Sequence, residues 1–489
     1  MPQHVQLYDT MTRGVRNVSA ADGATVRFYC CGPTVYGPAH IGNFRTFVSQ
    51  DVLRRVLELA GWRTKHVRNL TDVDDKTIRQ SQAVGELLTV FTDRWRELFR
   101  ADCAALNLLP PHVEPGAVAH IPQQIALVET LLAKNHAYRT DDGSVWFRLA
   151  SFPDYGKLSR VQERELAAGA SGAATVSGRN LADEYERESL ADFALWKARK
   201  PADGDNFWRA PWGEGRPGWH LECSCMSMRY LGESFDLHGG GVDLIFPHHE
   251  NENAQSEAAT GRPFAAHWFH TNHLLVENRK MSKSEGNLYT LADLQRRGFT
   301  PMETRYVLLA GKYSQPLNFT LESLAAARVA LKKLARAAAA LSAGAPALDY
   351  EQLVNRAAAL SADNPFHPAW AALQNDLNVS AALGRTFVAL KDAGRFADPP
   401  AAWLGFQRVI GALGLTLPPA DDDPVADAVP AEVRDLAAQR WAAKKEQHWQ
   451  LADQCRARLA ALGWTMQDAK DSYKLVRAGD IKNLSKNED

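Results

Sequence analysis

The sequence predicts an α/β protein that begins with a parallel-sheet domain, continues with an α-helical bundle and ends with a small C-terminal domain. Residues 24–70 follow the order strand, helix, strand, as in one crossover of a parallel sheet. Beyond about residue 323 the chain is alanine-rich and helical, and residues 416–424 are rich in proline and aspartate, as linkers between domains often are. We expect the sheet domain at 1–320, the bundle at 321–415, a linker at 416–430 and the last domain at 431–489.

The first strand of the predicted sheet covers residues 24–31. This run is rich in β-branched and aromatic residues and ends at Gly32-Pro33, which signals a turn. Helical sequence follows from about 44 to 59, and residues 62–70 return to strand character. His40 would then lie just past the carboxyl end of the first strand, where open α/β sheets bind their ligands.

An insertion is expected at about residues 120–215. The pattern there is mixed, and a run of glycine and alanine at 167–172 interrupts it. The sheet pattern resumes near Trp219, and residues 266–276 form an aromatic and aliphatic stretch with strand character. That strand would lead into a loop at residues 280–284.

The composition is that of an ordinary globular protein. Its 489 residues are 45% hydrophobic and 23% charged, which allows a large core. The amino terminus has no basic stretch followed by an apolar run, and the sequence has no segment of about 18 uninterrupted apolar residues. We therefore expect a cytoplasmic protein that does not bind a membrane.

The net charge of −1 argues against a protein that binds nucleic acid by bulk electrostatics, so any RNA contact must come from local patches. Arg328, Lys332 and Arg336 form one basic helical stripe, although such a stripe is more often a solvated face. The last domain combines basic and aromatic residues suited to stacking on unpaired bases, with core packing as the alternative for its tryptophans. They are Trp441, Lys444, Lys445, Trp449, Arg456, Arg458 and Trp464.

Cysteine, histidine and glutamate residues form a candidate metal site. Six cysteines are few for this length, and in a cytoplasmic chain they suggest thiols or metal ligands over a disulfide framework. His248 and Glu252 are four residues apart, so on a helix their side chains share one face. With Cys31 and Cys223 they would suit tetrahedral zinc, whereas unrelated buried thiols explain the spacing equally well.

Two neighbouring features complicate this site. Cys30 and Cys225 compete with the two cysteines beside them, and periodicity alone cannot choose between them. Residues 246–253 are too polar by composition to form a core helix.

Two short motifs lie about 240 residues apart. They read Pro38-Ala39-His40-Ile41-Gly42-Asn43 and Arg279-Lys280-Met281-Ser282-Lys283-Ser284. A lone His-Ile-Gly is common and a lone Lys-Met-Ser-Lys-Ser can arise in a solvated loop, but chance explains this order and distance poorly. The pair resembles the two nucleotide signatures of class I aminoacyl-tRNA synthetases, which have a Rossmann-type catalytic domain and build an aminoacyl-adenylate from ATP.

Lys280 and Lys283 suit the chemistry of that reaction. A carboxylate attacks the α-phosphate of ATP while negative charge develops on the departing pyrophosphate, so fixed positive charge is useful there. A lysine loop can close over the triphosphate, and Gly286 would permit the bend. The resemblance makes Lys283 the main catalytic candidate with Lys280 in support, and Mg²⁺ is expected with ATP.

His40 lies in a turn before a predicted helix, where imidazole and backbone N–H groups can point at phosphate oxygens. Alone, it would more often be an ordinary surface histidine. The resemblance implies that His40 and Asn43 serve in catalysis and in ATP binding. The family's motif usually ends in a second histidine, and Asn43 can donate a hydrogen bond but cannot become cationic.

Four longer runs resemble the cysteinyl-tRNA synthetase family, and the similarity covers nearly the whole chain. They are residues 31–36, 68–76, 218–224 and 238–252. The resemblance implies one zinc ion per chain, which binds the thiolate of substrate cysteine and for which serine is a poor ligand, so that no editing domain is needed. Its implied ligands are Cys31, Cys223, His248 and Glu252, which leaves Cys30 and Cys225 as packed thiols.

The same resemblance assigns two further contacts. Thr71 and Trp219 resemble residues that shape the cysteine pocket, although a tryptophan after glycine often belongs to the core. Gly240 and Asp243 resemble a contact to the ribose and adenine of ATP, although a run of three glycines is a weak signal by itself.

The resemblance as a whole implies a ligase that activates L-cysteine with ATP and transfers it to the 3′ end of tRNA(Cys), and we expect it to be a monomer. The nearest alternative is a related ligase that joins activated cysteine to an amino sugar, which has no use for an anticodon-recognition domain. A noncatalytic zinc-dependent RNA-binding protein is the alternative from another class. Residues 177–189 depart from the family's usual run, and nothing in the sequence explains that departure.

Overall fold

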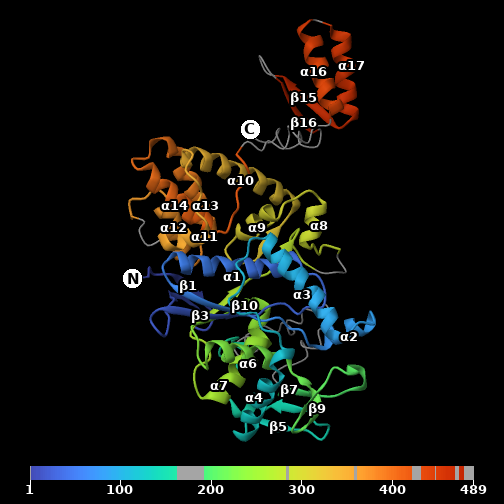
Figure 1. The fold of residues 1–489 in the computed structure, drawn as a ribbon, viewed down its shortest axis with the longest axis vertical. Coiled ribbons are helices and arrows are strands. Elements are labelled where there is room, and N and C mark those ends of the chain that lie inside the picture. The colour runs from blue at the N-terminus through green and yellow to red at the C-terminus, as the bar shows by residue number, and fades with distance from the viewer. Residues whose placement is uncertain are drawn as a thin grey trace, which may run out of the picture. The chain divides into compact units, whose positions relative to one another are not determined.

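Four parallel strands form the sheet at the centre of the larger unit of the molecule (Figure 1). In spatial order they are β11 (Trp268–Thr271), β10 (Leu237–Gly241), β3 (Thr25–Cys30) and β4 (Arg63–Arg68). The strand β4 pairs with one side of β3 and β10 pairs with the other, so the strand order reverses at β3. Ligands bind at such a switch point, outside the carboxyl ends of the strands. The predicted α/β fold with a Rossmann-type parallel sheet is confirmed.

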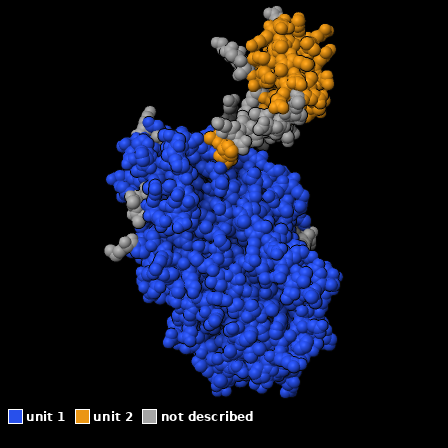
Figure 2. Space-filling view, in the orientation of Figure 1, with its two compact units in different colours: residues 1–417 blue, residues 418–489 orange. Residues whose placement is uncertain are grey.

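The computed structural model describes residues 2–161, 192–281, 286–356, 361–420, 431–446, 448–468 and 473–477. The chain forms two compact units, residues 1–417 and residues 418–489, which are blue and orange in Figure 2. The divergent segment 177–189 lies outside the described residues. The domain boundaries expected from the sequence stay predictions.

Helix α1 (Ile41–Leu59) joins β3 to β4 and begins three residues earlier than the sequence pattern predicts. His40 caps it, because its Nδ1 accepts the backbone N–H of Asn43 at 3.2 Å and Asn43 Oδ1 accepts the backbone N–H of His40 at 3.1 Å. This reciprocal cap satisfies amide groups that a helix start leaves unpaired. The sequence pattern misses it because histidine and asparagine are not the usual residues of such a cap.

Between β4 and β10 the chain builds a second sheet, which is antiparallel. Its strands follow the order β5-β6-β7-β9-β8 and span Ala137–Arg139, Val145–Phe147, Phe193–Ala198, Gly213–Pro217 and Trp208–Ala210. Helix α4 (Ile121–Ala133) packs on this sheet, and Phe147, Phe193 and Trp196 belong to the core that they enclose. Helices α2 (Asp75–Ala83) and α3 (Leu88–Ala105) precede it.

Two helices after this sheet carry polar side chains into the interior. Helix α6 (Trp219–Leu231) packs against α7 (Glu250–Thr260), which follows a short helical segment at Ile245–His249. Glu250 is buried and accepts two backbone N–H groups, at 2.9 Å and 2.7 Å. The expectation that residues 246–253 form no core helix is wrong, because residues 250–253 start α7 with buried side chains, and polar groups such as the carboxylate of Glu250 find hydrogen-bond partners inside the protein.

A short sheet, a hairpin and a set of helices complete the larger unit. The sheet has the order β13-β12-β14, at Arg279–Lys280, Leu274–Val276 and Leu317–Phe319. The hairpin pairs β1 (Gln6–Asp9) with β2 (Gly14–Asn17). The helices α8 to α14 span Leu291–Arg296, Pro301–Leu309, Leu321–Ser342, Tyr350–Arg356, His367–Gln374, Val379–Ala389 and Pro399–Ala412.

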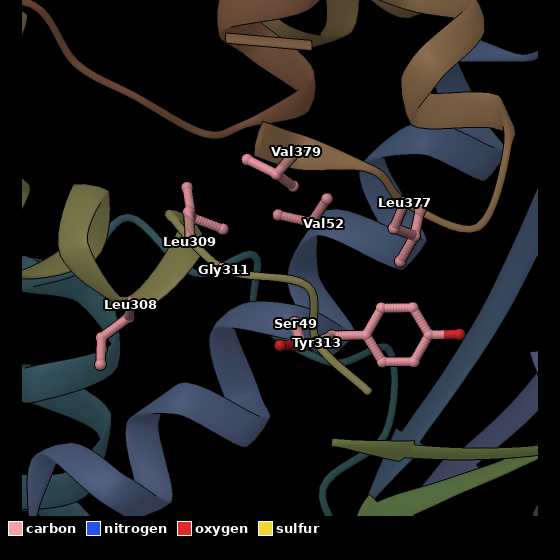
Figure 3. A pocket seen from close by; sticks show the side chains of 8 residues that line it. All are labelled: Ser49, Val52, Leu308, Leu309, Gly311, Tyr313, Leu377 and Val379. Atoms are coloured by element: carbon pink, nitrogen blue, oxygen red, sulfur yellow. The ribbon is translucent and has the colours of Figure 1, made fainter. Parts of the chain in front are cut away.

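A small cavity lies where α1, α9 and the start of α13 meet (Figure 3). Its volume is about 10 Å³, and side chains such as Val52, Leu309 and Val379 line it. The hydroxyl of Tyr313 is engaged with Asp376 at 2.5 Å. Because this volume holds about one water molecule, the cavity is no substrate site.

A buried ion network ties α1 to α9 and to the end of α14. Asp51 Oδ2 accepts Nε of Arg55 at 2.7 Å and is also paired with Arg305, whose Nε donates to the carbonyl of Leu413 at 2.7 Å. We predict that Arg305→Ala lowers the free energy of unfolding by about 3 kcal/mol, because the buried carboxylate loses a partner. Urea unfolding measures this loss. The exposed Arg356→Ala is the control, and equal effects of both changes would contradict the prediction.

The described residues of the smaller unit form two helices and a hairpin of strands. They are α16 (Ala431–Lys445), α17 (Trp449–Ala461), β15 (Trp464–Asp468) and β16 (Tyr473–Arg477). Leu436, Leu459 and Trp464 belong to its core. Among the helices of both units, as far as the structure describes them, none is long and apolar enough to cross a membrane.

Candidate active site

The four predicted metal ligands meet at the carboxyl end of β3. Cys31 directly follows that strand, Cys223 lies on α6, and His248 and Glu252 lie on either side of the start of α7. All four side chains are buried, and their ligand atoms lie within 4.8 Å of one another. The fold therefore gathers residues from three distant parts of the sequence into one cluster.

The separations between these atoms match the edges of a tetrahedron of metal ligands. Cys31 Sγ lies 3.9 Å from Cys223 Sγ and 3.7 Å from Glu252 Oε1, and His248 Nε2 lies 3.0 Å from Glu252 Oε1. In a tetrahedral site with Zn–S bonds of about 2.3 Å, two sulfurs are about 3.8 Å apart. The donor types and the distances both fit a zinc-type ion.

The cluster concentrates charge in a buried place. Burial raises the pKa of Glu252, but His238 and His248 outweigh it and hold that pKa at about 2. Burial lowers the pKa of His248, but Glu252 and Cys223 raise it to about 10. The pKa of Cys223 falls to about 6 despite burial, because Cys31 and His248 hydrogen-bond to it, whereas burial raises the pKa of Cys31. A buried carboxylate and thiolate need a cation nearby, which a proton on His248 or a metal ion can supply.

Four buried histidines around this cluster were missed by the sequence prediction: His220, His238, His249 and His270. His220 Nδ1 lies 2.8 Å from Nδ1 of His248, and His249 Nδ1 lies 2.7 Å from Nε2 of His270. Cys31, His238, His249 and Glu252 form a second group of ligand atoms within 4.8 Å of one another. A usable signal existed, because six of the 15 histidines fall between residues 220 and 270.

Cys30 and Cys225 belong to neither group of ligand atoms. Cys30 points from β3 into the hydrophobic core, since successive side chains of a strand face opposite sides, and burial raises its pKa. Cys225 lies two residues past Cys223 on α6 and packs in the core beside the antiparallel sheet, where burial raises its pKa to about 12. Both are packed thiols in this structure.

The predicted pocket residues Trp219 and Thr71 both lie next to segments that carry metal ligands. The ring centroid of Trp219 is 4.1 Å from that of His248. The backbone N–H of Thr71 donates to the carbonyl of Pro33 at 3.2 Å, in the turn after β3. Gly32 permits this approach, because a Cβ there would overlap the backbone carbonyl that follows β4.

The two sequence motifs meet in space although about 240 residues separate them. The backbone N–H of Ile41, next to His40, donates to the carbonyl of Tyr289 at 2.9 Å. Met281 lies so close to this turn that a Cβ at Gly42 would overlap its terminal methyl group. The start of α1 and the segments around the lysine loop therefore share one edge of the sheet domain.

Of the two predicted catalytic lysines, only Lys280 lies within the described residues. Lys280 is the last residue of β13 and is exposed, and Asn287 Nδ2 donates to its backbone carbonyl at 3.2 Å. Lys283 lies outside the described residues. On either side of the undescribed residues, Met281 and Tyr289 lie close to the start of α1.

Gly240 and Asp243, the predicted contacts to ATP, lie at the end of β10. A Cβ at Gly240 would be 2.7 Å from Cε1 of His249, so the absence of a side chain lets that ring reach its place. Asp243 lies in a single 3₁₀ turn after the strand, and its carboxylate occupies the space that a Cβ at Gly241 would need. Part of the glycine run is thus explained by packing around the histidine.

Comparison with known proteins identifies the family. The family model described as "tRNA synthetases class I (C) catalytic domain" matches residues 17–329. A cysteine–tRNA ligase of Opitutus terrae is 52% identical, over 97% of this chain and 99% of its own length. A cysteine–tRNA ligase of Chlamydia felis is 41% identical, over 97% of this chain and 98% of its own length.

Solved structures match the fold at much lower identity. Mycobacterium tuberculosis methionyl-tRNA synthetase in complex with methionyl-adenylate has a TM-score of 0.54 at 14% identity, over 80% of this chain and 89% of its own. The ternary complex of Agrobacterium radiobacter LeuRS with tRNA and LeuAMS has a TM-score of 0.55 at 12% identity, over 81% and 84%. Such likeness shows the fold alone. Because the sequence relatives extend over almost the whole of both chains, this protein belongs to the cysteine–tRNA ligase family of class I tRNA synthetases.

Proposed function

We propose that this protein is a cysteine–tRNA ligase, which activates L-cysteine with ATP to cysteinyl-adenylate and transfers the cysteinyl group to the 3′ end of tRNA(Cys). The observation that carries the proposal is the buried cluster of two thiols, an imidazole and a carboxylate at the carboxyl end of β3. This strand also leads into the turn at His40. A site for a thiol and a site for ATP would therefore lie at the same switch point of the sheet.

The clustered residues Cys31, Cys223, His248 and Glu252 would hold one zinc ion. When bound, the ion offers the substrate thiol a soft ligand position and favours its ionised form. Serine would be held weakly, because its hydroxyl does not ionise near neutral pH. Since a pocket that measures size alone separates such similar side chains poorly, this difference in chemistry would supply the selectivity.

The remaining site residues would bind and orient ATP with its Mg²⁺. His40 and Asn43 start helix α1, and the positive end of its dipole favours the negative phosphates of ATP there. Gly240 and Asp243 would contact the ribose and adenine. Lys283, supported by Lys280, would stabilise the negative charge that develops on the departing pyrophosphate.

The smaller unit would contact tRNA. Of its three tryptophan candidates, Trp464 is buried, Trp441 is half-buried with its ring centroid 5.4 Å from that of Tyr473, and Trp449 is 59% exposed. Trp449 is therefore the ring most accessible for stacking on a base. Lys444 Nζ already donates to the carboxylate of Asp468 at 2.6 Å.

In the larger unit Arg328 is paired with Glu303, so the basic stripe on α10 is partly neutralised.

Trp449→Ala is predicted to weaken tRNA binding by about 5- to 150-fold, because the stacking of one base on an aromatic ring contributes about 1–3 kcal/mol. Cysteine-dependent exchange of pyrophosphate into ATP should stay unchanged. The KM for tRNA in the charging reaction measures the effect. Leu451→Ala, a change at a 46% exposed residue of the same helix, is the control, and a similar effect of both variants would contradict the assignment.

Transfer of labelled cysteine onto total tRNA, with serine as the comparison, tests the proposed function. The expected result is charging with cysteine alone in the presence of ATP and Mg²⁺. Intact cysteine-dependent pyrophosphate exchange without charging would contradict tRNA as the acceptor and favour the ligase that uses an amino sugar. The absence of both reactions would favour a noncatalytic RNA-binding protein.

A further inference from the structure

We propose that the cluster contains a second, overlapping metal position formed by Cys31, His238, His249 and Glu252, which retains a zinc-type divalent cation when Cys223 is lost. The inference rests on the proposed zinc centre and adds a site to it. The ligand atoms of this second set are buried and lie within 4.8 Å of one another, as those of the first set do.

The carboxylate of Glu252 faces both sets. Its Oε1 lies 3.0 Å from Nε2 of His248 in the first set, and its Oε2 lies 2.9 Å from Nε2 of His238 in the second. His249 Nε2 lies 3.3 Å from Cys31 Sγ and 4.0 Å from Glu252 Oε1. Because the Cys31 thiol and the Glu252 carboxylate are common to both sets, only one of the two positions can be occupied by an ion at a time.

His249 is oriented as metal-binding histidines are. Its Nδ1 lies 2.7 Å from Nε2 of His270, and His270 Nδ1 lies 2.7 Å from Oγ1 of Thr10. This chain of contacts occupies the far nitrogen and turns Nε2 of His249 towards the cluster. His248 has the same arrangement in the first set, since its Nδ1 lies 2.8 Å from Nδ1 of His220.

The histidines that belong to only one of the two sets pack against different tryptophans. The His248 ring is 4.1 Å from the ring of Trp219, a predicted pocket residue. The rings of His238 and His249 instead lie 4.8 Å and 5.5 Å from Trp268, which is buried on β11. The second position therefore lies on the side of the cluster that faces the buried Trp268, away from Trp219. An ion bound there would take no part in cysteine activation.

Titration of the metal-stripped protein with Co²⁺ tests the second position, because thiolate-to-cobalt absorption reports how many thiolates bind the ion. The wild type is expected to bind one Co²⁺ with two thiolates. Cys223→Ala is expected to bind one Co²⁺ with about half of that absorption, and adding His249→Ala should weaken this binding by about 10-fold or more. His249→Ala alone should leave the wild-type spectrum, since it lies outside the first set.

A Cys223→Ala protein that binds no Co²⁺, or one whose affinity is unaffected by His249→Ala, would overturn the second position. Circular dichroism checks that each variant is folded, and Cys223→Ser replaces Cys223→Ala in the same test if the alanine variant does not fold. Failure of the wild type to bind Co²⁺ would overturn the proposed zinc centre as well, so the two proposals fail in different ways.

Discussion

Replacing Cys31 by serine is expected to remove bound zinc and cysteine activation together. Its Sγ is common to both sets of ligand atoms, so no alternative set of ligands remains intact. Loss of a residue that only orients a ligand already costs about 10- to 100-fold in metal affinity, and loss of a ligand should therefore cost more than about 100-fold. Zinc content and cysteine-dependent pyrophosphate exchange, measured on the same preparation, give the result.

The control for this change is Cys225→Ala, which removes a buried thiol outside both sets. It should keep its zinc and its rate of exchange, although it loses some stability because it leaves a small cavity. If Cys31→Ser contained no zinc and still activated cysteine at the wild-type rate, the metal would have no part in binding the substrate.

Replacing Lys283 by alanine is expected to lower the rate of cysteine-dependent pyrophosphate exchange by about 10²- to 10³-fold. This is the usual cost of removing one group that stabilises charge in the transition state. The KM for cysteine should change little, because the lysine is proposed to act on the phosphates and not on the amino acid. The assignment comes from the motif at residues 279–284, of which Lys283 lies outside the described residues.

Two lysine variants sharpen this test. Lys280→Ala should have a smaller effect, because Lys280 is proposed only to support its neighbour. Lys157→Ala changes a lysine whose side chain is 61% exposed, far from the motif in sequence, and should leave the exchange rate unchanged. A decrease of less than about tenfold for Lys283→Ala would assign the stabilising charge to another residue.

The sheet was predictable because buried strands leave a local signal. The runs of β-branched and aromatic residues at 24–31 and 62–70 contain β3 and β4. Two features lacked such a signal. The cap formed by His40 and Asn43 depends on side-chain geometry, and the burial of polar α7 depends on partners supplied by distant parts of the chain.

The metal cluster was predictable only in part. The spacing of His248 and Glu252 is a local pattern, but the nearness of Cys31 and Cys223 depends on the fold, so the resemblance to a family had to select them. His249 lies three residues before Glu252, a helical spacing that could have been used, whereas nothing in the sequence spacing links His238 to that carboxylate. The same fold that places them also explains Gly240, whose missing Cβ admits the His249 ring.

The most direct test of thiol recognition by the metal is the absorption spectrum of the cobalt-substituted wild-type protein with and without its amino acid. Adding L-cysteine should increase the thiolate-to-cobalt absorption, because the substrate contributes another thiolate, whereas L-serine at the same concentration should leave it unchanged. Equal spectra with cysteine and serine, in protein that binds one Co²⁺ and charges tRNA with cysteine, would contradict selection of the substrate through its thiol.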